Sequence, residues 1–161
     1  GNITNFKKQS LIDQYSKELQ NGMKKVTDWK NSQEQIYKDQ LAKANENFFK
    51  GLQFYPVAKN ILNSDPMKSR QNEPAVIELK NKIIKMEAYY AQRKSAYLTV
   101  KAKNNAQALK ELKAVQVLAS SNSRSLPATE LSQLQKSIDS LTTLSAPSVV
   151  KTAISVTLFL G

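Results

Sequence analysis

The fold is decided by residues 74–119, PAVIELKNKIIKMEAYYAQRKSAYLTVKAKNNAQALKELKAVQVLA, in which small and apolar residues recur at intervals of seven. One series comprises Ile77, Ile84, Ala91, Leu98, Asn105 and Leu112, and a second comprises Ala88, Ser95, Ala102 and Leu109. Such spacing is typical of the seam along which two α-helices pack in a coiled coil. The sequence therefore predicts one helix over about 74–119, with this seam buried against another helix.

A second long helix is predicted before it, over about 6–55. Apolar residues recur there at intervals of three and four, as Ile12, Tyr15, Leu19, Val26, Trp29 and Ile36 and, after a small shift, Tyr37, Leu41, Ala44, Phe48, Leu52 and Tyr55. We expect Trp29 and Phe48 to pack in the core. Gly22 stands where the stripe expects an apolar residue, which indicates a bend or the close approach of another helix. Pro56 is expected to end this helix.

The rest of the chain is predicted to form shorter elements. Residues 63–73 carry charged and amide side chains with almost nothing to bury and are predicted to form a loop. A third helix is predicted over 127–145, from Leu131, Leu134, Ile138, Leu141 and Leu144. The apolar tail, residues 147–161, fits either a strand or a helix, and we expect it to be buried.

These elements predict an all-α single domain over residues 1–161. We expect an elongated antiparallel helical bundle with coiled-coil-like packing, in which the two long helices form a hairpin and the shorter third lies along one half of it. The four glycines and five prolines of the chain are too few for a sheet protein rich in tight turns.

Composition argues against catalysis. The chain contains neither Cys nor His, so it lacks thiol nucleophiles, disulfides, the usual zinc ligands and the ordinary near-neutral general base. Phosphate-binding glycine loops are also absent from the sequence. The sequence therefore predicts a protein that is not an enzyme and holds no cofactor and no metal.

Basic and aromatic residues interleave over residues 86–109, within a chain of formal net charge +11. The candidate interaction surface comprises Tyr90, Arg93, Lys94, Tyr97, Lys101, Lys103 and Lys110. At 100° per residue Tyr90, Arg93, Lys94, Tyr97 and Lys101 fall on the side away from the predicted seam. We expect Arg93, Lys94, Lys101 and Lys103 to be exposed. Two interpretations stay open: a docking strip for an acidic partner, or a solvated wall whose tyrosines flank a neighbouring helix.

The leading hypothesis for function is a non-enzymatic protein–protein interaction or assembly module, such as an exported or surface-apparatus component of a bacterium. One alternative is a basic helical binder of nucleic acid or membrane. Another is an extracytoplasmic ligand-sensing domain of a membrane receptor. A protein partner is expected, an acidic one included, and a homo-oligomer and membrane association through the tail stay open. Localisation is unknown from the sequence, with extracytoplasmic or secreted preferred.

Overall fold

The computed structural model describes residues 2–145, with side chains described from Thr4 onward. Every element in this range is helical. The α-helices are α1 (Asn2–Lys50), α2 (Tyr55–Leu62), α3 (Pro74–Lys101), α4 (Asn105–Ser121) and α5 (Glu130–Leu144), and the 3-10 helices are η1 (Leu52–Phe54), η2 (Asp65–Arg70) and η3 (Ser123–Ser125). The prediction of an all-helical fold is confirmed for the described residues.

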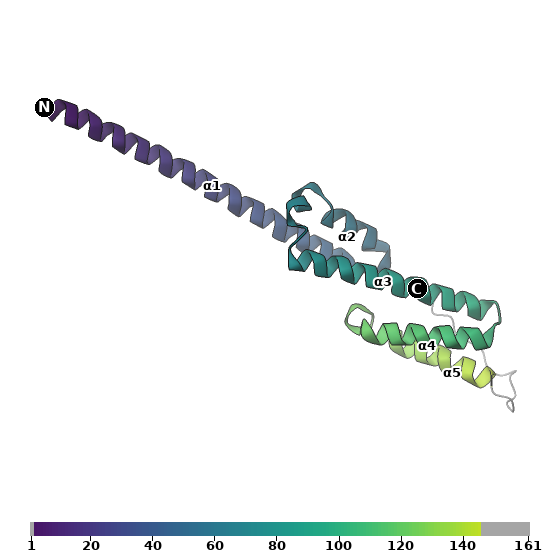
Figure 1. The fold of residues 1–161 in the computed structure, drawn as a ribbon. Coiled ribbons are helices and arrows are strands. Elements are labelled where there is room, and N and C mark those ends of the chain that lie inside the picture. The colour runs from purple at the N-terminus through teal and green to yellow at the C-terminus, as the bar shows by residue number, and fades with distance from the viewer. Residues whose placement is uncertain (1, 146–161) are drawn as a thin grey trace.

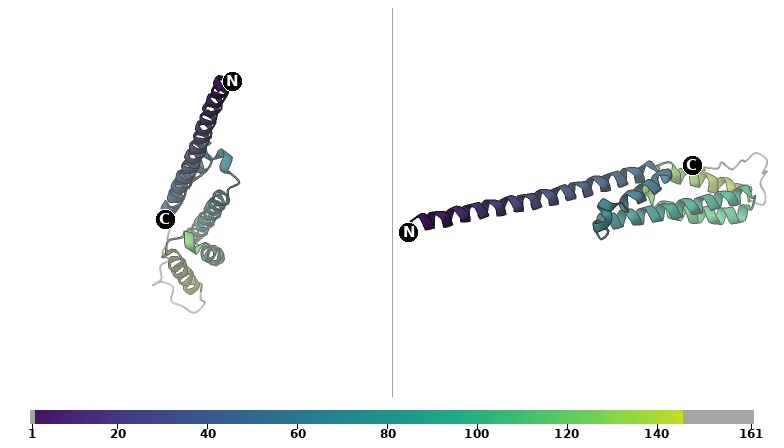
Figure 2. Two further views of the ribbon diagram at one scale, coloured as in Figure 1. Left: turned by 90° about the vertical axis from the view of Figure 1, so that its left-hand side faces the viewer. Right: turned by 90° about the horizontal axis from the view of Figure 1, so that it is seen from above.

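The first part of α1 projects from the rest of the molecule as a single straight helix (Figures 1 and 2). Every side chain from Thr4 to Ser32 is exposed, whereas Tyr37, Ala44 and Phe48 further along α1 are buried. We call residues 4–32 the arm and residues 33–145 the body. In the body, α1 packs against α2 and η2, while α3 runs on to contact α4, which in turn packs against α5 (Figure 1).

The predicted helix over 74–119 is wrong, because it is two helices. The chain reverses at Ala102, Lys103 and Asn104, so α4 returns alongside α3 (Figure 1). Lys103 adopts a left-handed conformation with φ 61°, which cannot continue a right-handed helix. The Asn104 side chain then caps α4 by accepting a hydrogen bond from the Gln107 backbone N–H at 3.4 Å. The expected hairpin of two long helices is therefore absent.

The predicted seam of α3 is also wrong, since Ile77, Ile84 and Leu98 are 45%, 61% and 54% exposed. The buried face lies one residue earlier and comprises Val76, Leu79, Ile83, Met86, Tyr89, Arg93, Ala96 and Tyr97. This face keeps the spacing of three and four residues. Two adjacent stripes of α3 thus satisfy the same periodicity, and the one that contains Arg93 faces the core.

The first helix ends earlier than predicted. Gly51, with φ 115°, ends α1 before Tyr55, and Pro56 lies in the first turn of α2, where its missing N–H costs no hydrogen bond. The predicted loop over 63–73 contains η2 and buries Met67 completely. The third helix, α5, lies within its predicted bounds. The tail 147–161 lies outside the described residues.

Candidate interaction surfaces

Large apolar side chains are exposed along the whole arm. They are Phe6, Leu11, Ile12, Tyr15, Leu19, Met23, Val26 and Trp29, and each is about half exposed or more. The expectation that Trp29 packs in the core is wrong, because it is 63% exposed, while Phe48 is buried as expected. Monomeric soluble proteins rarely expose contiguous apolar surface on this scale, so the arm is a candidate binding surface.

The exposed face of the arm continues the face that α1 buries in the body. With Leu19 set at zero and about 100° per residue, Tyr37 lies at about 0°, and Val26 and Ala44 both lie at about 340°. We call Ile12, Tyr15, Leu19, Gly22, Val26 and Trp29 the arm stripe. A single apolar face therefore runs along α1 and is covered by α2 and η2 in one half only.

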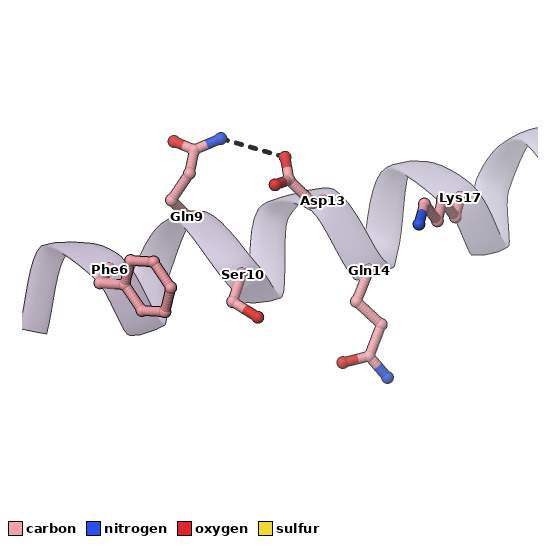
Figure 3. A pocket seen from close by; sticks show the side chains of 6 residues that line it. All are labelled: Phe6, Gln9, Ser10, Asp13, Gln14 and Lys17. Atoms are coloured by element: carbon pink, nitrogen blue, oxygen red, sulfur yellow. Dashed lines mark hydrogen bonds between the residues drawn. The ribbon is translucent and has the colours of Figure 1, made fainter. Parts of the chain in front are cut away.

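Shallow hollows lie along the arm, and two of them are formed by arm residues alone. The first is lined by Phe6, Gln9, Ser10, Asp13, Gln14 and Lys17, which all come from α1 (Figure 3), and the dashed line there marks the hydrogen bond from Gln9 Nε2 to Asp13 Oδ1 at 3.1 Å. The second is lined by Glu18, Leu19, Gly22, Met23, Val26, Thr27 and Lys30. It exists because Gly22 has no side chain, and nothing lies within 4 Å of where its Cβ would be.

Local interactions support the arm only weakly. Its side-chain hydrogen bonds include Gln9 to Asp13 at 3.1 Å and Gln14 to Glu18 at 3.5 Å. Such i,i+4 contacts contribute a few tenths of a kcal/mol each. Residues 4–32 contain only six lysines and three carboxylates, so the arm is not a helix held by dense charge pairs. Most helical stability in proteins comes from packing of an amphipathic face, and the arm lacks this within one chain.

The predicted surface on α3 is divided between the core and solvent. Lys94, Lys101, Lys103 and Lys110 are exposed, Tyr90 is half-buried, and Arg93 and Tyr97 are buried. The expectation that Arg93 is exposed is therefore wrong. We call the four exposed residues the turn lysines, since they flank the reversal between α3 and α4. The seven residues do not form one continuous strip.

Arg93 is buried because α5 supplies a carboxylate to it. Arg93 Nε lies 2.8 Å from Glu130 Oε1, and the Tyr89 hydroxyl donates a hydrogen bond to the same carboxylate oxygen. The Nε–H lacks a hydrogen-bond acceptor in good geometry among the described residues, so its contact with Glu130 is an ion pair. Burial raises the pKa of the Tyr89 hydroxyl, and the hydrogen bond to Glu130 raises it further.

The tyrosines of α3 pack beside this ion pair. The Tyr97 hydroxyl lies 3.3 Å from Ser137 Oγ on α5, and the Arg93 guanidinium lies 5.7 Å from the centre of the Tyr97 ring. Burial likewise raises the pKa of Tyr90, and the Glu130 carboxylate raises it further. These contacts join α3 to α5, so this part of the predicted surface holds the body together.

A second polar cluster lies where the arm meets the body. Arg70 of η2 donates a 2.7 Å hydrogen bond to Glu34 of α1 and lies 4.7 Å from the centre of the Tyr37 ring. The hydrogen bond to Glu34 raises the pKa of the Arg70 guanidinium. This contact fixes η2 on α1 just beyond the last residue of the arm. This contact was not predicted, because a loop predicted over residues 63–73 provides no helix to hold Arg70 against α1.

No protein-family model, curated protein or solved structure matches this chain. Among the described residues there is no group of three or more His, Cys, Asp or Glu side chains placed to hold a metal ion. The helices of residues 2–145 include none that combines the length and apolar character needed to cross a bilayer. Function must therefore be inferred from the exposed surfaces themselves.

Proposed function

We propose that this protein is a non-catalytic assembly module that binds another protein through the arm of α1. The exposed arm stripe is the observation that carries the proposal. Its residues would be buried by a second helix packing lengthwise, with side chains inserted between those of the stripe. The hollow at Gly22 would accept one such side chain, since its lining residues Leu19, Gly22, Met23 and Val26 are spaced as the four corners of a coiled-coil hole.

The energetics of the arm helix support this role. Most helical stability in proteins comes from packing of an amphipathic face, and the described residues of this chain leave the arm stripe exposed. Burial of a Leu, Ile or Val side chain contributes about 1.5–3 kcal/mol. A partner that covers Ile12, Leu19 and Val26 would therefore stabilise the arm far more than its own i,i+4 contacts do.

Site-specific photo-crosslinking tests the proposal. A photoreactive amino acid is placed at Leu19 on the stripe, and in a matched variant at Asn21, which is also exposed but lies about 200° around the helix. In cells that make the protein, we expect the Leu19 variant to form an adduct with a polypeptide and the Asn21 variant to form none. The adduct should disappear when Ile12 and Val26 are changed to Ser. Equal adducts from both positions, or none from either, would overturn the proposal.

A second candidate function is binding of an anionic surface through the turn lysines. It is favoured by their exposure and by their positions before, within and after a single helix reversal. Lys94, Lys101, Lys103 and Lys110 would contact phosphates of nucleic acid or lipid, with affinity that falls steeply as salt rises. Changing all four to Gln should abolish retention on DNA or on phosphatidylserine vesicles at low salt. Retention that survives this change would exclude the turn lysines as the binding surface.

A further inference from the structure

We propose that the partner of the arm is a second copy of this chain, paired antiparallel about a two-fold axis that passes between Gln20 and Asn21. This inference rests on the proposed function of the arm and names its partner. It follows from three properties of the described residues: the order of the stripe residues, the charges that flank them, and the length of helix left uncovered.

The stripe residues are complementary to their own reversed order. In an antiparallel pair centred between residues 20 and 21, Ile12 faces Trp29 of the other copy, Tyr15 faces Val26, and Leu19 faces Gly22. Each layer thus combines a larger with a smaller residue, which keeps the distance between the two helices even. The hollow at Gly22 receives Leu19, and the two-fold axis repeats this contact.

The parallel arrangement lacks this complementarity. It would place each stripe residue opposite itself, so that Trp29 meets Trp29 in one layer and Gly22 meets Gly22 two layers earlier. A layer of two bulky rings and, two layers away, a layer without side chains do not both pack well at one distance between the helices. The order of large and small residues therefore favours the antiparallel pair.

The charges that flank the stripe also favour the antiparallel orientation of the two helices. In the antiparallel pair, Glu18 on one edge lies nearest Lys25 of the other copy, and the two-fold axis creates this opposite-charge contact twice. In a parallel pair, the same edge would bring Lys25 close to Lys30 of the other copy, which is repulsive. Glu18 and Lys25 are both exposed and available.

The length of the arm fits this centre. Pairing about residues 20 and 21 places Lys8 of one copy opposite Gln33 of the other. The outermost stripe layer, Ile12 against Trp29, therefore lies before Tyr37, the first buried residue of α1, which η2 covers through Arg70, and Thr4 in the first turn of the other copy comes level with Tyr37. A hollow lined by Trp29, Gln33, Pro66 and Arg70, among others, lies at this junction, where the amino-terminal turn of the other copy would arrive. The two bodies then lie at opposite ends of the paired arms.

Sedimentation of the full chain with charge reversals tests the pairing. We expect a mass twice that of the 18.0 kDa chain. Glu18→Lys and Lys25→Glu should each weaken the dimer about tenfold, because each creates two like-charge contacts, and the double reversal should restore it. Asp13→Lys and Lys17→Glu make the same changes in net charge away from the stripe and should have no effect. A parallel dimer would instead be strengthened by Lys25→Glu, which would overturn the proposal.

A distance measurement checks the direction independently. The chain has no cysteine, so Ser10→Cys, on the outer side of the arm, accepts a single spin label. In the antiparallel dimer the two labelled residues are about 31 Å apart along the helix axis, whereas in a parallel dimer they lie at the same height. A spin–spin distance shorter than about 30 Å would contradict the antiparallel pairing.

The outcomes also separate this inference from the proposed function. A chain that stays monomeric at high concentration, yet still gives the Leu19-specific adduct with a different protein, overturns the self-pairing and leaves the assembly role intact. A dimer that is insensitive to both charge reversals overturns the arm as its interface. A monomer that gives no stripe-specific adduct overturns both.

Discussion

Arg93 of α3 and Glu130, the first residue of α5, form an ion pair inside the body, with Nε 2.8 Å from Oε1 and each side chain only 7% exposed. The two residues are 37 positions apart in sequence, so their contact joins α5 to α3 directly. The carboxylate also lies in the first turn of α5, where the helix dipole favours negative charge. Glu130 is therefore stabilised from three directions: by Arg93, by the Tyr89 hydroxyl and by its own helix.

Glu130→Ala should lower the free energy of unfolding by about 3 kcal/mol, because it leaves the Arg93 charge buried without a partner. Replacing both residues, as Arg93→Met with Glu130→Met, should cost less than this single change, since no uncompensated charge remains. Urea denaturation measures both. Asp139→Ala, an exposed carboxylate on the same helix, is the control and should change stability by less than about 0.5 kcal/mol. Equal effects of Glu130→Ala and the control would contradict the buried pair.

Buried tyrosines should make the protein sensitive to alkaline pH. Burial raises the pKa of Tyr55 and Tyr89 above the ordinary value near 10, so both stay neutral in the folded state while they ionise in the unfolded chain. Their contribution to stability is complete below pH ~10 and is lost as pH rises above it, by about 1.4 kcal/mol per tyrosine at pH 11.

The loss of stability at alkaline pH can be assigned to a single tyrosine by substitution. Tyr55→Phe should reduce the fall in unfolding free energy between pH 9 and pH 11, because it removes one buried hydroxyl that ionises only in the unfolded chain. Urea midpoints at the two pH values provide the measurement. An undiminished fall in the Tyr55→Phe variant would mean that this hydroxyl does not titrate on unfolding.

Ile83 and Ile84 test which face of α3 is packed. Ile83 is 1% exposed and Ile84 is 61% exposed, although they are adjacent in sequence. Ile83→Ala should destabilise the protein by about 2–5 kcal/mol, since it removes buried methyl groups and leaves a cavity. Ile84→Ala should change stability by less than about 0.5 kcal/mol. The opposite order of effects would indicate that the face containing Ile84 is the buried face of α3.

The reversal between α3 and α4 should be improved by glycine. Lys103 has φ 61°, a conformation in which a side chain costs about 1 kcal/mol and glycine costs little. Lys103→Gly should therefore raise the thermal midpoint by about 2–4 °C, and Lys103→Val should lower it. A thermal melt followed by circular dichroism decides this, and a lower midpoint for Lys103→Gly would indicate that the reversal is not where we place it.

The helical class and α5 could both be predicted from the sequence. Leu134, Ile138 and Leu141 form one apolar stripe on α5, and no second stripe competes with it. It was insufficient for α3, where Ile77, Ile84 and Leu98 compete with Ile83, Met86 and Tyr97 on a neighbouring stripe. Local periodicity cannot decide between two such faces. In the structure the buried stripe is the one that contains Arg93, and the distant residue Glu130 neutralises that side chain in the core.

The reversal at Lys103 was missed because neither Gly nor Pro marks it. Ala102 and Asn105 continued the heptad spacing across it, and a left-handed lysine has no signature in composition. Asn104 was the available signal, since asparagine is favoured at the start of a helix. The arm stripe itself was visible as a pattern, but its exposure was not, because periodicity indicates that a face is apolar without indicating what covers it.

Because α1 is one continuous helix, it would fix the distance between the two bodies in an assembled pair. From an axis between Gln20 and Asn21 to Tyr37, the helix spans about 25 Å, which sets how far each body stands from the centre. Inserting seven residues near Asn31 would move each body outward by about 10 Å and turn it by only about 20°. Inserting two residues there would instead swing each body about 200° around the arm, so spacing and orientation could be changed separately by the number of residues added.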